Sequence, residues 1–186
     1  DRLRNCGARL LWRGEPEYPE RLHALRTPPP WLWLCGKAAR LRASTCAMVG
    51  SRRTPPLLAE VARRLARALA DAGVCVASGM AAGADSAAHE GAEAGRAGTI
   101  AIPARGLLGA LERIGLRRDG WTVLALETPD EPFSAALAVR RNALIAAMGD
   151  GLILVASELK GGSSYAVRWA LDSGRPLWCL DAGRAT

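Results

Sequence analysis

The side chains best suited to binding an anion stand where a short apolar run, residues 47–49, ends. Gly50, Ser51, Arg52 and Arg53 follow at once, and a long amphipathic segment begins shortly after them. This pattern predicts a strand, a tight turn and a helix, whose N–H groups and dipole favour a phosphate. Gly50 lets the backbone approach closely, Ser51 can donate its hydroxyl, and Arg52 can form paired hydrogen bonds with phosphate oxygens. Since many strands end in such a turn, the motif alone is equally compatible with a structural role.

Three further segments place small or polar side chains at expected element boundaries. Residues 78–85 and 157–164 each follow an apolar run and each open a helix. Residues 140–142 are expected to head or interrupt a helix that ends at Gly149. With the first turn, these segments predict a basic phosphate-binding rim. Its members are Gly50, Ser51, Arg52, Arg53, Ser78, Gly79, Gly83, Arg140, Arg141, Asn142, Lys160, Gly161, Gly162 and Ser163.

Two other groups of ionisable residues invite a catalytic interpretation. Asp85 and His89 stand four residues apart and would share one helix face. No third ligand stands near them in the sequence, so we expect Asp85 to act as a helix cap or a partner of the helix dipole, and His89 to hydrogen-bond locally. Glu127 is expected to form a structural hydrogen bond at a strand end. We therefore predict no metal site, no cofactor and no catalytic group.

The elements that must position these side chains follow a regular pattern. Apolar runs at 47–49, 74–77, 99–102, 122–126, 151–155 and 176–180 alternate with segments of helical period. The clearest of these segments is 57–72, which Gly73 ends. The alternation predicts an α/β fold with a doubly wound, mostly parallel sheet and helices on both faces. Ligands of such sheets bind beyond the carboxyl ends of the strands, where the four segments lie.

The chain before the regular pattern is expected to form an arm. Residues 1–43 are predicted as a lead-in that packs on the core, and residues 44–186 as the core domain. Within the lead-in, the alternation of residues 31–34 fits a strand that covers one edge of the sheet. The arginines of segment 57–72 are expected to form a solvated helix face rather than a DNA contact; they are Arg63, Arg64 and Arg67.

The amino-acid composition indicates which kind of partner and which cellular compartment to expect for this protein. The formal net charge of +7 comes almost entirely from arginine, which supports an anionic partner. Five widely spaced cysteines without a Cys-x-x-Cys pair argue against a disulfide framework or a zinc site, and Cys75 and Cys179 are expected to be buried. No stretch reaches membrane-spanning length and no signal peptide opens the chain. We therefore expect a cytoplasmic protein with no membrane partner.

The ordered set of motifs resembles the DNA-processing protein A family (DprA, also called Smf) from about Tyr18 to Leu180. The resemblance rests on Tyr18-Pro19 with Leu22 and Pro28-Pro29, Val49-Gly50-Ser51-Arg52, the segment 78–85 with His89, Gly98-Thr99-Ile100-Ala101, Glu127-Thr128-Pro129, Arg141-Asn142 and Lys160-Gly161-Gly162. It implies an extended Rossmann-like core and a homodimer. It also implies a protein that binds and protects single-stranded DNA and assists RecA loading in natural transformation and recombination.

The resemblance also assigns site residues. It implies that Gly50, Ser51, Arg52, Arg141 and Asn142 contribute to a positively charged DNA pocket. The residues that would line the same rim are Gly161, Gly162 and Ser163. The family's second arginine after the asparagine is Ala143 here, and Arg140 is a candidate to replace its charge.

Two other functions remain open from the sequence. One is a protein that binds a nucleotide-derived small molecule, or a phosphoribohydrolase of the lysine-decarboxylase-like superfamily. Gly161-Gly162 match the opening of that superfamily's catalytic turn, but Arg168 stands where its catalytic glutamate would be. Because that carboxylate is missing, simple nucleotide binding is favoured over glycosidic hydrolysis. The other function is an interaction module whose basic rim no longer binds.

Overall fold

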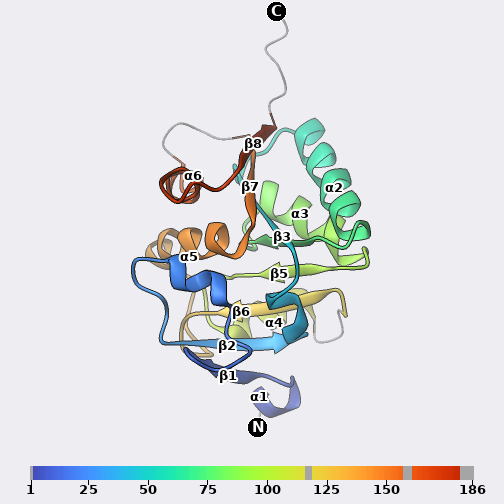
Figure 1. Cartoon of the computed structure of the whole chain (residues 1–186). Helices are drawn as coiled ribbons and strands as arrows, with labels where there is room; N and C mark the ends of the chain where they lie inside the picture. Colours follow the sequence, from blue (N-terminus) through green and yellow to red (C-terminus); the bar gives the residue numbers. More distant parts are fainter. Residues whose placement is uncertain (1, 116–118, 157–160, 181–186) are drawn as a thin grey trace, which may run out of the picture.

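The computed structural model describes residues 2–115, 119–156 and 161–180, which form one eight-stranded sheet covered by helices (Figure 1). The strands are β1 (Arg9–Trp12), β2 (Trp31–Gly36), β3 (Thr45–Gly50), β4 (Cys75–Ser78), β5 (Thr99–Ala101), β6 (Trp121–Ala125), β7 (Gly151–Val155) and β8 (Leu177–Leu180). The α-helices are α1 (Arg2–Asn5), α2 (Pro56–Asp71), α3 (Ala84–Glu93), α4 (Leu107–Ile114), α5 (Ala135–Met148) and α6 (Ser163–Asp172). Two short 3₁₀ helices are η1 (Glu20–Ala24) and η2 (Ala38–Leu41).

The strand order is β1-β2-β6-β5-β4-β3-β7-β8. From β6 to β8 all neighbours are parallel, whereas β1 pairs with β2, and β2 with β6, in the antiparallel sense. All six apolar runs of the sequence became strands. The predicted α/β class, a mostly parallel sheet with helices between successive strands, is confirmed.

Helices cover both faces of the sheet, as Figure 1 shows. Alternate residues of β3 divide between the two faces: Ala47 and Val49 pack with α5 and α6, while Cys46 and Met48 pack with α2 and α3. Helix α4 covers β5 and β6 on the same face as α2 and α3. Because β3 is buried on both faces at the centre of the sheet, its last residue is a rigid point from which a site can be built.

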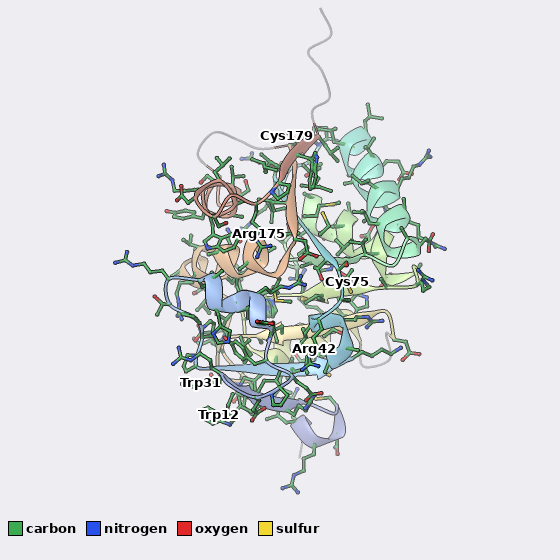
Figure 2. All side chains as sticks on the ribbon, in the orientation of Figure 1. Trp12, Trp31, Arg42, Cys75, Arg175 and Cys179 are labelled. Atoms are coloured by element: carbon green, nitrogen blue, oxygen red, sulfur yellow. The ribbon has the colours of Figure 1, made fainter. Side chains whose placement is uncertain are left out.

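The lead-in is part of this sheet. Strand β2 extends the parallel strands through its register with β6, and β1 adds an outer strand. Trp12 and Trp31 are cross-strand neighbours with ring centroids 5.9 Å apart, and they lie at this edge of the molecule (Figure 2). The strand predicted at 31–34 is confirmed, and it joins the sheet through backbone hydrogen bonds.

Two local predictions were wrong. Residues 140–142 neither head nor interrupt a helix, since α5 begins five residues earlier, at Ala135. The Ser134 hydroxyl caps it by accepting a hydrogen bond from the Leu137 N–H (3.1 Å). Cys179 is exposed, although Cys75 is buried as expected (Figure 2). The reason is that β8 is the last strand of the described sheet, so an apolar run there is covered less completely than at the centre.

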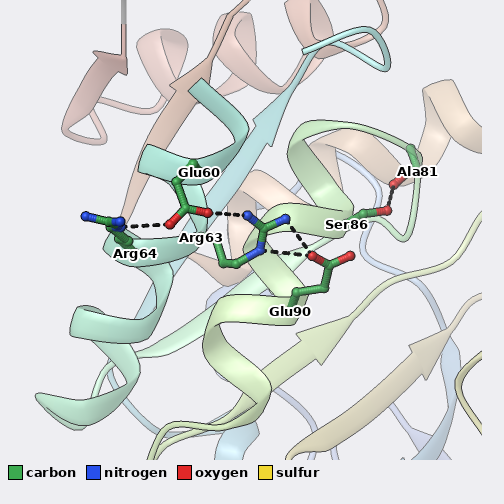
Figure 3. A network of polar contacts seen from close by, with 6 residues as sticks. All are labelled: Glu60, Arg63, Arg64, Ala81, Ser86 and Glu90. Atoms are coloured by element: carbon green, nitrogen blue, oxygen red, sulfur yellow. Dashed lines mark hydrogen bonds and ion pairs between the residues drawn. The ribbon is translucent and has the colours of Figure 1, made fainter. Parts of the chain in front are cut away.

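The arginines of α2 form ion pairs on its outer surface. Arg63 bridges Glu60 of its own helix and Glu90 of α3, and Arg64 also pairs with Glu60 (Figure 3). Arg67 pairs with Asp71. The prediction of a solvated, structural face is confirmed, because these guanidiniums already have carboxylate partners.

Among the described helices none is long and apolar enough to cross a membrane.

Candidate functional site

The turn after β3 is held tightly between neighbouring elements. A Cβ on Gly50 would collide with the Val155 carbonyl of β7, and the Ser51 N–H donates to the Ala156 carbonyl (2.7 Å). On the other side, the Ser51 carbonyl accepts from the Ala84 N–H at the start of α3 (3.1 Å). Gly83 adopts a positive φ of 75°, which brings its backbone against this same turn. The backbone that carries Arg52 is therefore fixed on two sides.

The anion-binding features of this turn differ from those expected. The Ser51 hydroxyl accepts a hydrogen bond from the Arg53 N–H (3.0 Å) and keeps its own proton to donate. Helix α2 starts at Pro56 after Pro55, and neither proline has an N–H to offer. The helix N-terminus that faces the site instead belongs to α6, which begins at Ser163.

The turn at the end of β4, residues 78–80, contributes space to the site rather than groups that face a ligand. Ser78 is fully buried and donates its hydroxyl to the Met48 carbonyl (2.7 Å), so it does not face a ligand as predicted. Gly79 leaves room for a guanidinium, because a Cβ there would overlap the Nη1 atom of Arg141. Met80 follows with a φ of 61°, in the left-handed region. The segment therefore bends around the Arg141 side chain.

Helix α5 separates the two arginines that the sequence grouped together. Arg141 and Asn142 are buried and face the turn after β3, and the Asn142 amide donates to the Gly162 carbonyl (2.7 Å). Arg140 points elsewhere: it forms an ion pair with Glu127 (3.0 Å) and lines a separate hollow beside the 28–30 segment. Successive helix residues differ in direction by about 100°. The predicted placement of Arg140 in the rim is therefore wrong, and Glu127 forms this ion pair where a structural hydrogen bond was expected.

These elements enclose a hollow of about 330 Å³, which we call the basic hollow. Arg52 and Arg53 stand at its exposed rim, and Arg141 and Asp85 lie buried at its floor. Its lining residues are Val49, Gly50, Ser51, Arg52, Arg53, Ala81, Asp85, Ala135, Ala138, Val139, Arg141, Asn142, Gly161, Gly162 and Ser163. Lys160, also predicted for the rim, lies outside the described residues. Arg52 and Arg141 thus line one cavity, as the anion-binding interpretation requires.

The floor of the basic hollow carries a buried, incompletely satisfied cation. The Arg141 side chain is 5% exposed, and its Nη2 lies 3.7 Å from Asp85 Oδ2. Its Nε has no hydrogen-bond partner in the part of the chain that the structure describes. Burial lowers the pKa of Arg141, Asp85 opposes that effect, and the charge of Arg52 adds to it. A buried donor without a partner is costly, so an anion that accepts from it would be bound with a gain in free energy.

A second hollow of about 300 Å³ adjoins the first and shares Arg52, Ala81 and Arg141 with it. Arg105, Arg113 and Phe133 also line it. None of these three was predicted. Arg105 comes four residues after β5, so the rule that ligands meet the carboxyl ends of strands could have found it.

Phe133 gives the second hollow an exposed aromatic face. The Arg52 guanidinium carbon lies 5.8 Å from the centroid of the Phe133 ring. This distance is within the range of a cation–π contact. Arg113 donates to the Met80 carbonyl (3.3 Å), so it is tied to the turn that encloses Arg141. The two hollows together offer cations and one planar apolar surface.

His89 hydrogen-bonds locally as predicted, and Asp85 lies in the first turn of α3, where a partner of the helix dipole was expected, but it does not cap the helix, whose N-cap is Gly83. Asp85 accepts a hydrogen bond from the Ala81 N–H (3.2 Å) in the first turn of α3. The His89 ring bonds Thr99 Oγ1 through Nδ1 (2.7 Å) and accepts from the Met80 N–H through Nε2 (3.3 Å). Burial lowers the pKa of His89 to about 3, so the ring is neutral. Among the described residues, no three His, Cys, Asp or Glu side chains are grouped as a metal site would need.

Comparisons with known proteins agree with this fold. A family model described as DNA recombination-mediator protein A matches residues 9–185. Protein Smf of Escherichia coli is 30% identical over 169 residues, which cover 88% of this chain and 45% of that protein. The chain spans about half the length of the curated relatives it matches.

Two solved structures are similar over nearly the whole chain. DNA processing protein A of Helicobacter pylori, a structure described for its single-stranded DNA binding mode, superposes with a TM-score of 0.83 at 26% identity, covering 96% of this chain and 82% of that one. DNA processing protein A of Streptococcus pneumoniae gives a TM-score of 0.85 at 25% identity, covering 95% and 64%. The extended Rossmann-like core that the sequence resemblance implied is thereby confirmed.

Proposed function

Because this chain belongs to the DNA recombination-mediator protein A family, we propose that it binds single-stranded DNA at the basic hollow. The observation that carries the proposal is the meeting of Arg52 with Arg141, a buried cation whose Nε lacks a partner. The relative from Helicobacter pylori, whose single-stranded DNA binding mode has been described, supports the choice of ligand.

In this proposal the chemistry divides between the two hollows. A backbone phosphate occupies the basic hollow, where Arg141 and Arg52 provide positive charge and the start of α6 provides N–H donors. The neighbouring base lies in the second hollow, against Phe133. Stacking on an aromatic ring tolerates every base, so we expect little sequence preference.

The protein acts by binding and not by catalysis. Arg168, which stands where the related phosphoribohydrolases have a glutamate, is exposed and does not line the basic hollow. Asp85 is the carboxylate that does line it among the described residues, and it is engaged by Arg141 and the Ala81 N–H. A group so engaged is poorly placed to activate water.

We extend the proposal to a wider role, which membership of the family supports. The protein protects single-stranded DNA and assists RecA loading during natural transformation and recombination, and it acts as a homodimer. Light scattering tests the dimer, and a RecA filament-assembly assay on coated DNA tests the hand-off. A monomer at all concentrations, or no effect on filament assembly, would contradict the respective part.

Fluorescence anisotropy tests the binding itself. Labelled oligo-dT, the same length of duplex DNA and a labelled nucleotide are titrated at two salt concentrations. We expect oligo-dT to bind most tightly and its affinity to fall with salt, because bound cations release counterions from the strand. Tighter binding of the free nucleotide would favour the small-molecule function instead. Salt-insensitive or absent binding of oligo-dT would contradict the proposal.

A further inference from the structure

We propose that Asp85 determines which phosphate the basic hollow accepts. Its negative charge makes the site favour the singly charged phosphodiester inside a DNA strand over the doubly charged terminal phosphate of a nucleotide. This inference rests on the proposed function, because it concerns the same site.

The charge of Asp85 is not needed for its backbone contact. Its carboxylate accepts a hydrogen bond from the Ala81 N–H (3.2 Å), which a neutral amide oxygen could accept equally well. Asp85 is nonetheless 5% exposed, and its Oδ2 lies 3.7 Å from Arg141 Nη2 at the floor of the hollow. A buried carboxylate beside a buried guanidinium reduces the net positive charge of the site.

The ionised groups around Asp85 are few among the described residues. Arg141 of α5 faces it directly, and Arg52 of the turn after β3 lies close enough to lower the pKa of Arg141. His89, on the same helix, is neutral and hydrogen-bonded to Thr99. Burial raises the pKa of Asp85, while Arg141 and nearby hydrogen-bond donors act in the opposite direction. The floor therefore pairs one carboxylate with one guanidinium, whose Oδ2 and Nη2 atoms lie 3.7 Å apart.

This balance leaves the surplus positive charge at the rim. Asp85 offsets part of the charge of Arg141, so Arg52 at the rim adds the further positive charge that attracts a ligand. A phosphodiester carries one negative charge, which the rim can neutralise. A terminal phosphate carries about 1.5 to 2 negative charges at pH 7, and the additional charge would lie near Asp85. Like charges repel more strongly in a partly desolvated site than in water.

The test compares two nucleotides that differ by one ionisable oxygen. Thymidine 5′-monophosphate and its phosphate methyl ester compete with labelled oligo-dT for the wild-type protein and for Asp85→Asn. We expect the wild type to prefer the methyl ester by at least about tenfold, as a like-charge interaction at this depth implies. Asp85→Asn should bring the two affinities to within about twofold, because the repulsion is removed.

Asp71→Asn serves as the matched control. It removes one carboxylate from the exposed surface of α2, where Asp71 pairs with Arg67, and so changes the net charge equally. It should leave the preference for the methyl ester unchanged. If circular dichroism shows that Asp85→Asn is unfolded, the relative affinity of the wild type for the monophosphate and the methyl ester still tests the proposal.

The other possible outcomes contradict either the role of Asp85 or the proposed function. Equal affinities in the wild type, a preference for the monophosphate, or failure of both nucleotides to compete would overturn the role of Asp85, as would an unchanged preference in a folded Asp85→Asn. These results leave the proposed function standing if oligo-dT itself binds. Failure of oligo-dT to bind the wild type would overturn the proposed function.

Discussion

At the scale of single residues, the missing side chain of Gly79 makes room for a functional group of the site. A Cβ at Gly79 would overlap the Arg141 guanidinium, whereas a Cβ at Gly162 would meet nothing closer than the Asn142 amide at 3.5 Å. Both glycines were predicted for the rim on the same grounds. Their surroundings assign them different roles: Gly79 creates space for a cation, and Gly162 lies at the open mouth of the hollow.

We therefore predict that Gly79→Ala weakens single-stranded DNA binding at least about tenfold, equivalent to about 1.4 kcal/mol. The physical reason is that the guanidinium must move from the floor of the basic hollow. Gly162→Ala is the matched control and should bind nearly as the wild type does. Both affinities are measured by anisotropy with oligo-dT, and equal affinities for the two variants would contradict the role given to Gly79.

A second prediction at this scale concerns thiol reactivity. Cys179 is exposed on β8, whereas Cys46 and Cys75 are buried, and burial raises the pKa of each of these two to about 11. Because the thiolate is the reactive form, iodoacetamide should label Cys179 long before Cys46 or Cys75 in the native protein. Mass spectrometry after tryptic digestion gives the order. Equal labelling of Cys75 and Cys179 under native conditions would contradict the assigned burial.

At the scale of elements, the strands and α2 could be predicted from the sequence because each forms from a local pattern. Apolar runs of three to five residues identified β3 to β8. The start of α5 could not be predicted from the Arg140–Asn142 motif, because Ser134 caps the helix six residues earlier. The motif that suggested function lay inside the helix and did not mark its beginning.

Only part of the candidate site could be predicted from the sequence, and the reason is physical. Turns at the carboxyl ends of β3 and β4 converge in any parallel sheet, so Gly50 and Gly79 were foreseeable. The direction of a side chain on a helix depends on the helix's position over the sheet, which no local pattern encodes. This is why Arg140 was wrongly grouped with Arg141. Phe133 precedes α5, and its contact with Arg52 was missed because no local pattern relates that segment to the turn after β3.

Helix α3 yields a prediction about pH. His89 is held neutral, with a pKa of about 3 in the folded protein against an ordinary value of 6.5. The unfolded chain therefore binds a proton that the folded one does not, and stability should fall as the pH drops from 6.5 towards 3. One such group contributes a slope of up to about 1.4 kcal/mol per pH unit.

Urea unfolding at a series of pH values tests this prediction. His89→Gln removes the titrating ring, so its stability should depend less steeply on pH between about 6 and 4. An identical pH dependence in wild type and His89→Gln would show that His89 is not held neutral in the folded state.

At the scale of the whole molecule, the net charge of +7 overstates the charge available to a ligand. The arginines of α2 are paired with Glu60, Glu90 and Asp71, and Arg140 is paired with Glu127. Exposed pairs of this kind contribute little to stability, but they neutralise charge locally. The basic side chains that line the two hollows are Arg52, Arg53, Arg105, Arg113 and Arg141. The anionic partner should therefore be attracted to the carboxyl ends of the central strands, where the two hollows lie.

The most direct test of this account is the salt dependence of oligo-dT binding for the wild type, Arg52→Ala and Arg140→Ala. Each variant loses one exposed arginine, so the net charge changes equally. We predict that Arg52→Ala lowers affinity at least about tenfold and reduces the slope of log affinity against log salt by about 0.7, the value for one phosphate of a single strand. Arg140→Ala should retain the wild-type affinity and slope. A loss for Arg140→Ala equal to or larger than that for Arg52→Ala would show that DNA does not bind at the basic hollow.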